Sequence, residues 1–553
     1  MEAFRKLKLI TLVISFILLT WFVYTARSKE DPVPNIFIGS AHLVDYQSAD
    51  TPYAVILNTM SDETGSLTTQ GTLPLYCLSD KNEKVKTSFR KSDRNRHCLW
   101  KNYYIQCDFK HPVNSIQLID YYGNGVEMSV TKPVQKKIPL VACLSRMFYY
   151  DNWQTALAVL EMYHAMGVNE LSLHVINVIQ DIYDLLELYK KEINLKIYPG
   201  YLAPQIAGQD PNEKSESMNH LLCYNECLLN YREAAEFILF ADMDDLITST
   251  GGNLYDTVKK AQLQNPIAVN FEFLWKTSSY AKISSPSEFS IPRIFNGLYV
   301  DTTETYGKSI VVPKRIDFSR IHNFRGIELK GKLLKSVTLP EQDGFTIHLR
   351  GVRKHKTGEY DMKLPTNSTL FEAKTENIQR INEFLQKRLR GFRGRANIVP
   401  LNALSTATYN FEKRLRNPSF QRAFNALPTT PFFLPQFIRC YEMFINATKP
   451  LCIGTRNCDI DYTNGPKCQV STSNYVGFKH DKVQVYVAYN RKLEKQETCQ
   501  LEKRAVELVD QTYTMIISLC FLKQILRPVK EPDRTMVYAA AVGLAFARAA
   551  RLF

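Results

Sequence analysis

Three aspartates follow a short apolar run in the segment FILFADMDDL, residues 237–246. The apolar residues end at Ala241, and Asp242, Asp244 and Asp245 come directly after them. Carboxylates this close raise one another's cost of ionisation unless a positive group lies between them. Carboxylate oxygens suit Mg²⁺ or Mn²⁺, and alternation along an extended chain would let Asp242 and Asp244 converge on one ion. The segment therefore indicates a divalent-metal site.

Two other interpretations of these aspartates compete with a metal site, and the first of them is discounted. D-x-D after an apolar strand is also the nucleophile motif of haloacid-dehalogenase-type phosphatases. That motif belongs on the first strand of its domain and needs a later G-D-x-x-x-D, which this chain lacks. Aspartates at a strand end can also simply cap a helix or make a turn. The buried approach to the motif favours the metal interpretation.

Two later histidines are candidates to complete a metal site. His322 lies in RIHNFRG, and His348 closes the apolar stretch of FTIHLRG, with Arg350 two residues further on. Imidazole is a common metal ligand, although most lone histidines are ordinary packed or exposed side chains. We expect His348 to be the ligand because it stands at the end of an apolar strand.

The segments before the aspartates alternate between strands and helices. KIPLVACLS, residues 137–145, is a continuous apolar run of the kind found in strands buried on both faces of a parallel sheet. Further strands are expected at 170–176, 195–201 and 237–241, with helices at 151–167, 182–192 and 217–233. This order predicts a parallel α/β sheet. Ligands in such sheets lie beyond the carboxyl ends of the strands, where the aspartates are expected.

The N-terminus carries a hydrophobic segment, LITLVISFILLTWFVYTA, at residues 9–26. Its eighteen uncharged residues approach the length of a membrane-spanning helix. Arg5, Lys6 and Lys8 precede it and place the short tail in the cytoplasm. A cleaved signal peptide is the alternative, but the run is long and 24–26 is a poor cleavage site. We predict a single-pass type II membrane protein of the secretory pathway, in the Golgi.

Composition agrees with a lumenal protein of more than one domain. The chain has 553 residues, twelve cysteines and a formal net charge of +14. In an oxidising lumen the cysteines indicate mainly disulfides. The positive charge would favour nucleic-acid binding, but the lumenal topology argues against that partner. The basic run at 386–395 is interpreted as a solvated helix end, with attraction to acidic glycans or phosphates as the alternative.

Several segments together resemble glycosyltransferase family 92. VACLSRMFYYDNWQTALAVLEMYHAMGVNELSLHV is similar to the opening of that family, which has V-A-C, an early Trp and then E-x-Y-x-x-x-G-V. NECLLNYRE resembles its Asn-Asp-Cys helix and FILFADMDD its F-x-D-x-D-E segment. KSIVVPKRIDFSRIH and IHLRG resemble its later P-x-x-V…H and H-x-R pieces. The segments keep the family's order over residues 137–390, which is much more specific than D-x-D alone.

The resemblance implies a GT-A type fold, which is Rossmann-like with a mostly parallel sheet and flanking helices. It also implies Mn²⁺ (or Mg²⁺) and an inverting β-1,4 transfer of a hexose, most of all galactose. The donor would be a UDP-sugar and the acceptor an N-glycan or another glycoconjugate. Charge develops on the β-phosphate of the leaving UDP, and an ion held by Asp242 and Asp244 would neutralise it as a Lewis acid. His348 would be the remaining metal ligand.

The resemblance suggests roles for four further residues. Asp245 would hold donor sugar hydroxyls, Asn225 would face the donor, and Arg350 would pair with the diphosphate. Inversion needs a carboxylate base on the acceptor hydroxyl. Glu272, at the end of the strand that follows the aspartates, is the candidate base, and an ordinary surface carboxylate is the alternative.

The predicted organisation has five parts: a cytoplasmic tail at 1–8, a transmembrane signal anchor at 9–26, a lumenal stem or N-terminal β-rich region at 27–136, the GT-A domain at 137–390 and a C-terminal Cys-containing module at 391–553. The chain departs from the resembled pattern at Glu226, where Asp is usual, at Asp245, where Glu is usual, and at the single His348. A catalytically inactive, membrane-anchored glycan-binding or scaffolding member of the same fold is therefore the alternative function.

Overall fold

The computed structural model describes residues 34–45, 51–62, 75–91, 97–279, 283, 285–296, 299–322, 324–326, 335–350, 353–354, 360–361, 399–445, 452, 458–480, 483–502 and 506. All of them belong to one compact unit, Met1–Leu508. The predicted transmembrane segment at 9–26 and the chain beyond 506 lie outside the described residues. Among the helices that are described, none combines the length and the apolar character needed to cross a membrane.

A mixed β-sheet forms the centre of the predicted glycosyltransferase domain. Its parallel half has the order β12-β10-β9-β13, with bounds Leu195–Pro199, Glu170–Val175, Ile138–Met147 and Ala235–Ala241. β16 (Tyr299–Val311) joins β13 in the antiparallel sense, and β15, β20 and β14 follow, with bounds Ala268–Ser279, Gly344–Arg350 and Asp245–Ser249. β19 (Lys335–Thr338) pairs with β15. The predicted α/β class and the four parallel strands are confirmed, whereas the rest of the sheet is mixed.

Helices α2 (Trp153–Ala165), α3 (Gln180–Glu192), α4 (Pro211–Lys214) and α5 (His220–Tyr231) lie between the parallel strands in the sequence, and α6 (Leu254–Gln264) lies between β14 and β15. The side chain of Asn152 accepts a hydrogen bond from the Thr155 amide, which caps α2, and Asn253 caps α6 in the same way. Gly167 ends the α2 segment with φ of 85°, a conformation that suits glycine. Every residue of α5 is buried, so this helix lies inside the protein rather than on its surface.

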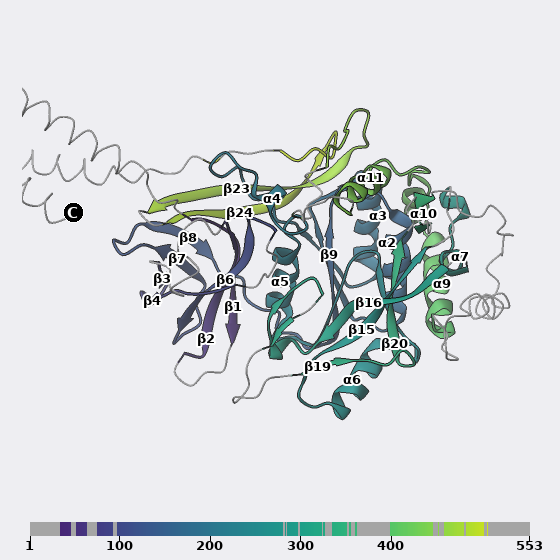
Figure 1. The fold of residues 1–553 in the computed structure, drawn as a ribbon, viewed down its shortest axis with the longest axis horizontal. Coiled ribbons are helices and arrows are strands. Elements are labelled where there is room, and N and C mark those ends of the chain that lie inside the picture. The colour runs from purple at the N-terminus through teal and green to yellow at the C-terminus, as the bar shows by residue number, and fades with distance from the viewer. Residues whose placement is uncertain are drawn as a thin grey trace, which may run out of the picture. The chain divides into compact units, whose positions relative to one another are not determined.

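A second sheet joins the two ends of the described chain (Figure 1). Its order is β11-β23-β24-β1-β2-β6-β5, with bounds Asn177–Ile179, Cys468–His480, Val483–Gln496, Asn35–Asp45, Tyr53–Ser61, Lys101–Phe109 and Ser88–Lys91. β1 and β24 are parallel neighbours, and β23 pairs with β11 of the central region. The C-terminal hairpin therefore completes a sheet that begins with the N-terminal strands.

The remaining elements are short. A four-stranded sheet has the order β4-β3-β7-β8, with bounds Lys84–Lys86, Tyr76–Ser79, Ser115–Ile119 and Gly125–Ser129. Two strand pairs are β17 with β18 (Ile316–Ser319, Phe324–Gly326) and β21 with β22 (Arg353–Lys354, Tyr360–Asp361). The other helices are α7 (Ile291–Asn296), α9 (Leu401–Leu415), α10 (Pro418–Asn425) and α11 (Leu434–Ile445), with 3₁₀ turns at Pro286–Glu288 and Pro313–Arg315.

Disulfides connect distant parts of the sequence, as predicted for the cysteines. The described pairs are Cys77–Cys107, Cys98–Cys452, Cys143–Cys227, Cys440–Cys458 and Cys468–Cys499. Cys98–Cys452 joins the N-terminal β-region to the C-terminal segment, and Cys143–Cys227 joins β9 to α5. A buried thiol, Cys223, remains reduced on α5. Several covalent links therefore fix the elements around α5 and the parallel strands.

Candidate active site

The three aspartates lie in a tight turn between β13 and β14. The Asp245 amide donates to the Asp242 carbonyl oxygen at 3.0 Å, and the Asp242 amide donates to Asp245 Oδ2 at 3.2 Å. β14 then pairs with β20, and this register puts Asp245 opposite His348. The Leu349 amide donates to the Asp244 carbonyl oxygen at 2.6 Å. Pairing of β14 with β20 therefore brings the predicted histidine to the aspartates across about 100 residues of sequence.

Asp244, Asp245 and His348 form a cluster whose possible ligand atoms all lie within 4.8 Å of one another. His348 Nε2 lies 2.9 Å from Asp244 Oδ2. Asp245 is fully buried, whereas the Asp244 side chain is 40% exposed. Two carboxylates and an imidazole are a donor set that fits Mn²⁺ or Mg²⁺, and the exposed Asp244 gives an ion access from solvent.

Asp242 makes different contacts from the other two aspartates. Its Oδ2 lies 2.8 Å from Lys308 Nζ, and the same ammonium lies 3.4 Å from Asp245 Oδ2. Lys308 is 1% exposed and comes from β16. The sequence paired Asp242 with Asp244 as ligands, whereas the structure groups Asp244 with Asp245 and gives Asp242 a lysine partner.

The buried lysine sets the protonation of this site. Burial disfavours the charge of Lys308, but Asp242 and Asp245 outweigh it and raise the pKa of the ammonium. Burial also works against an ionised Asp242, yet Lys308 and His220 hold the pKa of Asp242 well below its usual value. For Asp245 burial prevails over Lys308 and raises its pKa to about 6.

Helix α5 contributes two further groups to Asp242. Tyr224 Oη donates to Asp242 Oδ1 at 3.3 Å, and His220 Nε2 lies 3.4 Å from the same oxygen. Burial and the charge of Lys308 lower the pKa of His322, the second histidine considered in the sequence, and the charge of Asp242 opposes this. Lys308, His220 and Tyr224 were not predicted; a lysine opening the apolar run KSIVV was the one available signal for Lys308.

Asn225 uses its side-chain amide within the fold. It donates to the carbonyl oxygens of Leu221 and Ser319, at 2.8 and 3.3 Å, and its Oδ1 accepts from the Ser319 amide at 2.8 Å. The side chain is fully buried. These contacts tie β17 to α5 and occupy the amide that was expected to face the donor.

Glu272, the predicted base, lies on β15 away from the cluster. Its carboxylate accepts from Thr338 Oγ1 at 3.2 Å and from the Gly307 amide at 3.4 Å. Glu272 is registered opposite Ser309, the neighbour of Lys308. Successive side chains of a strand point to opposite faces, so Glu272 and Lys308 leave this strand pair on opposite faces. The backbone of Arg350 ends β20 beside the cluster, but its side chain lies outside what the structure describes.

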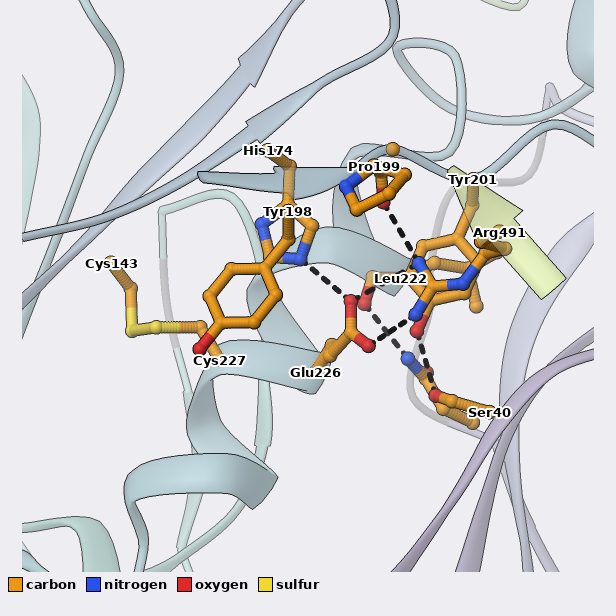
Figure 2. A network of polar contacts seen from close by, with 12 residues as sticks. Ser40, Cys143, His174, Tyr198, Pro199, Tyr201, Leu222, Glu226, Cys227 and Arg491 are labelled. Carbon is orange, nitrogen blue, oxygen red and sulfur yellow. Dashed lines mark hydrogen bonds and ion pairs between the residues drawn. A yellow bond between two sulfur atoms is a disulfide. The ribbon is translucent and has the colours of Figure 1, made fainter. Parts of the chain in front are cut away.

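A buried ion network on the other side of α5 joins this helix to the C-terminal hairpin (Figure 2). Glu226 accepts from Arg491 of β24, and His174 Nε2 of β10 lies 2.6 Å from Glu226 Oε2. Arg491 also donates to the Pro199 carbonyl oxygen at 2.9 Å and packs 3.9 Å from the centre of the Tyr201 ring. Glu226, which stands where the resembled pattern usually has Asp, therefore faces the C-terminal hairpin.

Replacing Arg491 by methionine is expected to lower the free energy of unfolding by about 3–5 kcal/mol, because it leaves Glu226 as an unpaired buried charge. Burial alone would raise the pKa of Glu226, but Arg491 and His174 lower it below its ordinary 4.5. Stability from this group should therefore be lost in the wild type only as the pH falls below about 4.5. Denaturant unfolding measures the loss, and Glu226→Gln combined with Arg491→Met should recover part of it. Equal stability of Arg491→Met and wild type would contradict the network's role.

Comparisons with known proteins agree on one class. The sequence model of Glycosyltransferase family 92 matches residues 138–389. Glycosyltransferase family 92 protein F59C6.8 of Caenorhabditis elegans is 26% identical over 376 residues, 64% of this chain and 67% of that protein. Protein F55C10.4 of the same family and organism is 26% identical over 377 residues, 65% and 69% of the two chains.

Among solved structures, S. aureus TarS 1-349 in complex with UDP-GlcNAc aligns at 12% identity, 53% of this chain and 82% of that chain, with a TM-score of 0.23. This score is too low to support any inference about fold or ligand. The sequence matches define residues 138–389 as a glycosyltransferase domain. The match over residues 138–389 and the two relatives confirm the resemblance to glycosyltransferase family 92 noted in the sequence.

Proposed function

We propose that this protein is a metal-dependent glycosyltransferase of GT-A type that moves galactose from UDP-galactose to a hydroxyl of a glycan, with inversion and a β-1,4 linkage. The resemblance to the family supports sugar transfer. The observation that carries the metal dependence is the Asp244–Asp245–His348 cluster beside the carboxyl end of β13. Ligands of α/β sheets bind at that edge, so a nucleotide-sugar fits the same place.

Asp244, Asp245 and His348 would hold Mn²⁺ or Mg²⁺ in this proposal. When bound, the ion supplies Lewis-acid stabilisation of the charge on the leaving diphosphate. Lys308 keeps Asp242 ionised and fixed between β13 and β16, which supports the turn that presents Asp244. The contacts of Asp245 favour a ligand role over direct binding of sugar hydroxyls. Glu272 is the sequence-based candidate for the base, and its described contacts are to Thr338 and Gly307.

We further propose that the chain is a single-pass type II membrane protein of the Golgi that acts on N-glycans or related glycoconjugates. The hydrophobic segment at 9–26 supports the anchor. The disulfides support an oxidising compartment, since such bonds are rare in the cytosol.

The test is turnover of a panel of UDP-sugars by the purified full-length chain with Mn²⁺, with EDTA, and with Mn²⁺ restored in excess. We expect hydrolysis or transfer of UDP-galactose with Mn²⁺, its loss in EDTA and its recovery when the ion is restored. A folded protein that turns over no UDP-sugar under any of these conditions would overturn the enzyme proposal. The same protein binding glycans without turnover would support the inactive glycan-binding alternative.

A further inference from the structure

A charged side chain stands at the end of the central parallel strand. Arg146 lies at the carboxyl end of β9, between two strands of the parallel half of the sheet, and only 7% of its surface is exposed. Its guanidinium packs 4.4 Å from the centre of the Phe148 ring. Burying a permanent positive charge is costly unless an anion or several acceptors satisfy it.

The hydrogen bonds of Arg146 do not satisfy it. Nη1 lies 3.0 Å from His220 Nδ1, and Nε is buried without a hydrogen-bond partner. No hydrogen bond of Nη2 and no carboxylate partner of Arg146 occurs among the described residues. A guanidinium can only donate, so His220 Nδ1 must accept. The proton of His220 is then on Nε2, which faces Asp242 Oδ1 at 3.4 Å.

Other buried arginines of the described chain differ from Arg146 in having a carboxylate within salt-bridge distance. Arg414 Nε lies 3.1 Å from Glu161 Oε1, and Arg491 is paired with Glu226. Arg232 lies 3.9 Å from Glu233 and donates to the Ile316 carbonyl oxygen. Arg146 contacts His220, and His220 in turn faces the carboxylate of Asp242. The ammonium of Lys308 lies against the same carboxylate. Arg146 therefore has no direct carboxylate partner among the described residues, and it acts on Asp242 only through space, where its charge helps to lower the pKa of that carboxyl group.

We propose that Arg146 binds the diphosphate of the nucleotide donor. The inference rests on the proposed function and adds a residue that sequence reasoning did not assign. The guanidinium fork matches phosphate oxygens, and among the described contacts only its Nη1 is hydrogen-bonded, to His220, while Nε has no hydrogen-bond partner. The position also fits, because Arg146 is joined through His220 to Asp242 at the edge where the acidic cluster lies.

In this assignment the two buried cations, Lys308 and Arg146, have different roles. Lys308 is enclosed by Asp242 and Asp245 and neutralises protein carboxylates. Arg146 is hydrogen-bonded to His220, which is a neutral acceptor. His220 is neutral because burial, and after it the charge of Arg146, lowers its pKa well below the ordinary value. The lysine is therefore a structural cation, and the arginine is the cation available to a ligand.

The experiment measures binding of UDP, uridine and inorganic pyrophosphate to the full-length chain with Mn²⁺ present, by calorimetry. Arg146→Met should weaken UDP and pyrophosphate binding about ten- to a hundredfold, the usual range for loss of a charged hydrogen bond, and leave uridine binding unchanged. Arg146→Lys should recover part of the loss. Arg90→Met is the matched control, because that guanidinium has its own carboxylate 2.7 Å away, Asp317 Oδ1, and its loss should not change the affinity for UDP.

The outcomes separate this inference from the proposed function. Wild-type affinity for UDP in a correctly folded Arg146→Met variant would overturn the role of Arg146 and leave the glycosyltransferase proposal standing. If the wild type binds pyrophosphate through Arg146 but does not bind UDP, the anion site is supported and the UDP-sugar donor fails. Absence of both kinds of binding in the wild type would overturn both. Thermal unfolding without ligand verifies that each variant is folded.

Discussion

Asp244→Ala is expected to abolish sugar transfer while the protein stays folded. Asp244 contributes a carboxylate to the acidic cluster, 2.9 Å from His348 Nε2, and its side chain is 40% exposed. Removing it should reduce Mn²⁺ affinity and lower turnover about a thousandfold or more, because metal stabilisation of a leaving group is worth several kcal/mol. Turnover of the donor and Mn²⁺ binding by electron paramagnetic resonance measure the two effects.

The exposure of Asp244 makes this variant interpretable. Its truncation creates no cavity in the core and leaves the amide of Leu349 bonded to the Asp244 backbone, so the melting temperature should change little. Asp459→Ala removes another exposed aspartate, away from the cluster, and should behave as the wild type. Full activity in Asp244→Ala would refute the metal assignment.

The sequence predicted the parallel half of the central sheet because the signal was local. Continuous apolar runs such as 138–144 and 237–241 have the length and composition of strands buried on both faces, and capped helices separate them. The pairing of β1 with β24 had no local signal, since more than 400 residues separate the partners and either strand alone is compatible with many neighbours. Sequence periodicity predicts where strands form, and long-range packing determines which strands pair.

In the candidate site, too, local sequence signals predicted the residue types, whereas long-range packing decided their partners. The residue types were informative, because two of the three aspartates after a buried strand do lie together with the histidine that closes another strand. The pairing of Asp242 with Asp244 assumed an extended chain, but the hydrogen bond from Asp245 to Asp242 closes a turn and presents Asp244 and Asp245 to His348 instead. Lys308 reaches the turn from β16, and no spacing rule connects a lysine to aspartates more than 60 residues earlier.

Lys308→Met is expected to destabilise the fold and to lower sugar transfer severely. The ammonium lies between the partly buried carboxylate of Asp242, at 2.8 Å, and the fully buried carboxylate of Asp245, at 3.4 Å. Its removal leaves both without a counter-charge, at a cost of about 3–5 kcal/mol in the free energy of unfolding. Denaturant unfolding measures the stability, and donor turnover under folding conditions measures the activity. A Lys308→Met protein as stable and as active as the wild type would contradict the role given to this lysine.

The pH dependence distinguishes charge from packing. The pKa of Asp245 in the folded wild type is about 6, above its ordinary 3.8, so the folded state binds the extra proton and stability falls as the pH rises between those values. Without Lys308 the pKa values of Asp242 and Asp245 should both rise, which extends this fall to higher pH. The deficit in stability of Lys308→Met relative to the wild type should therefore be smaller near about pH 5 than near about pH 8. Asp242→Asn combined with Lys308→Met removes one of the two carboxylate charges that lose the lysine, so it should recover stability at high pH. A deficit of stability that is the same at both pH values would instead mean that Lys308 acts through packing of its alkyl chain.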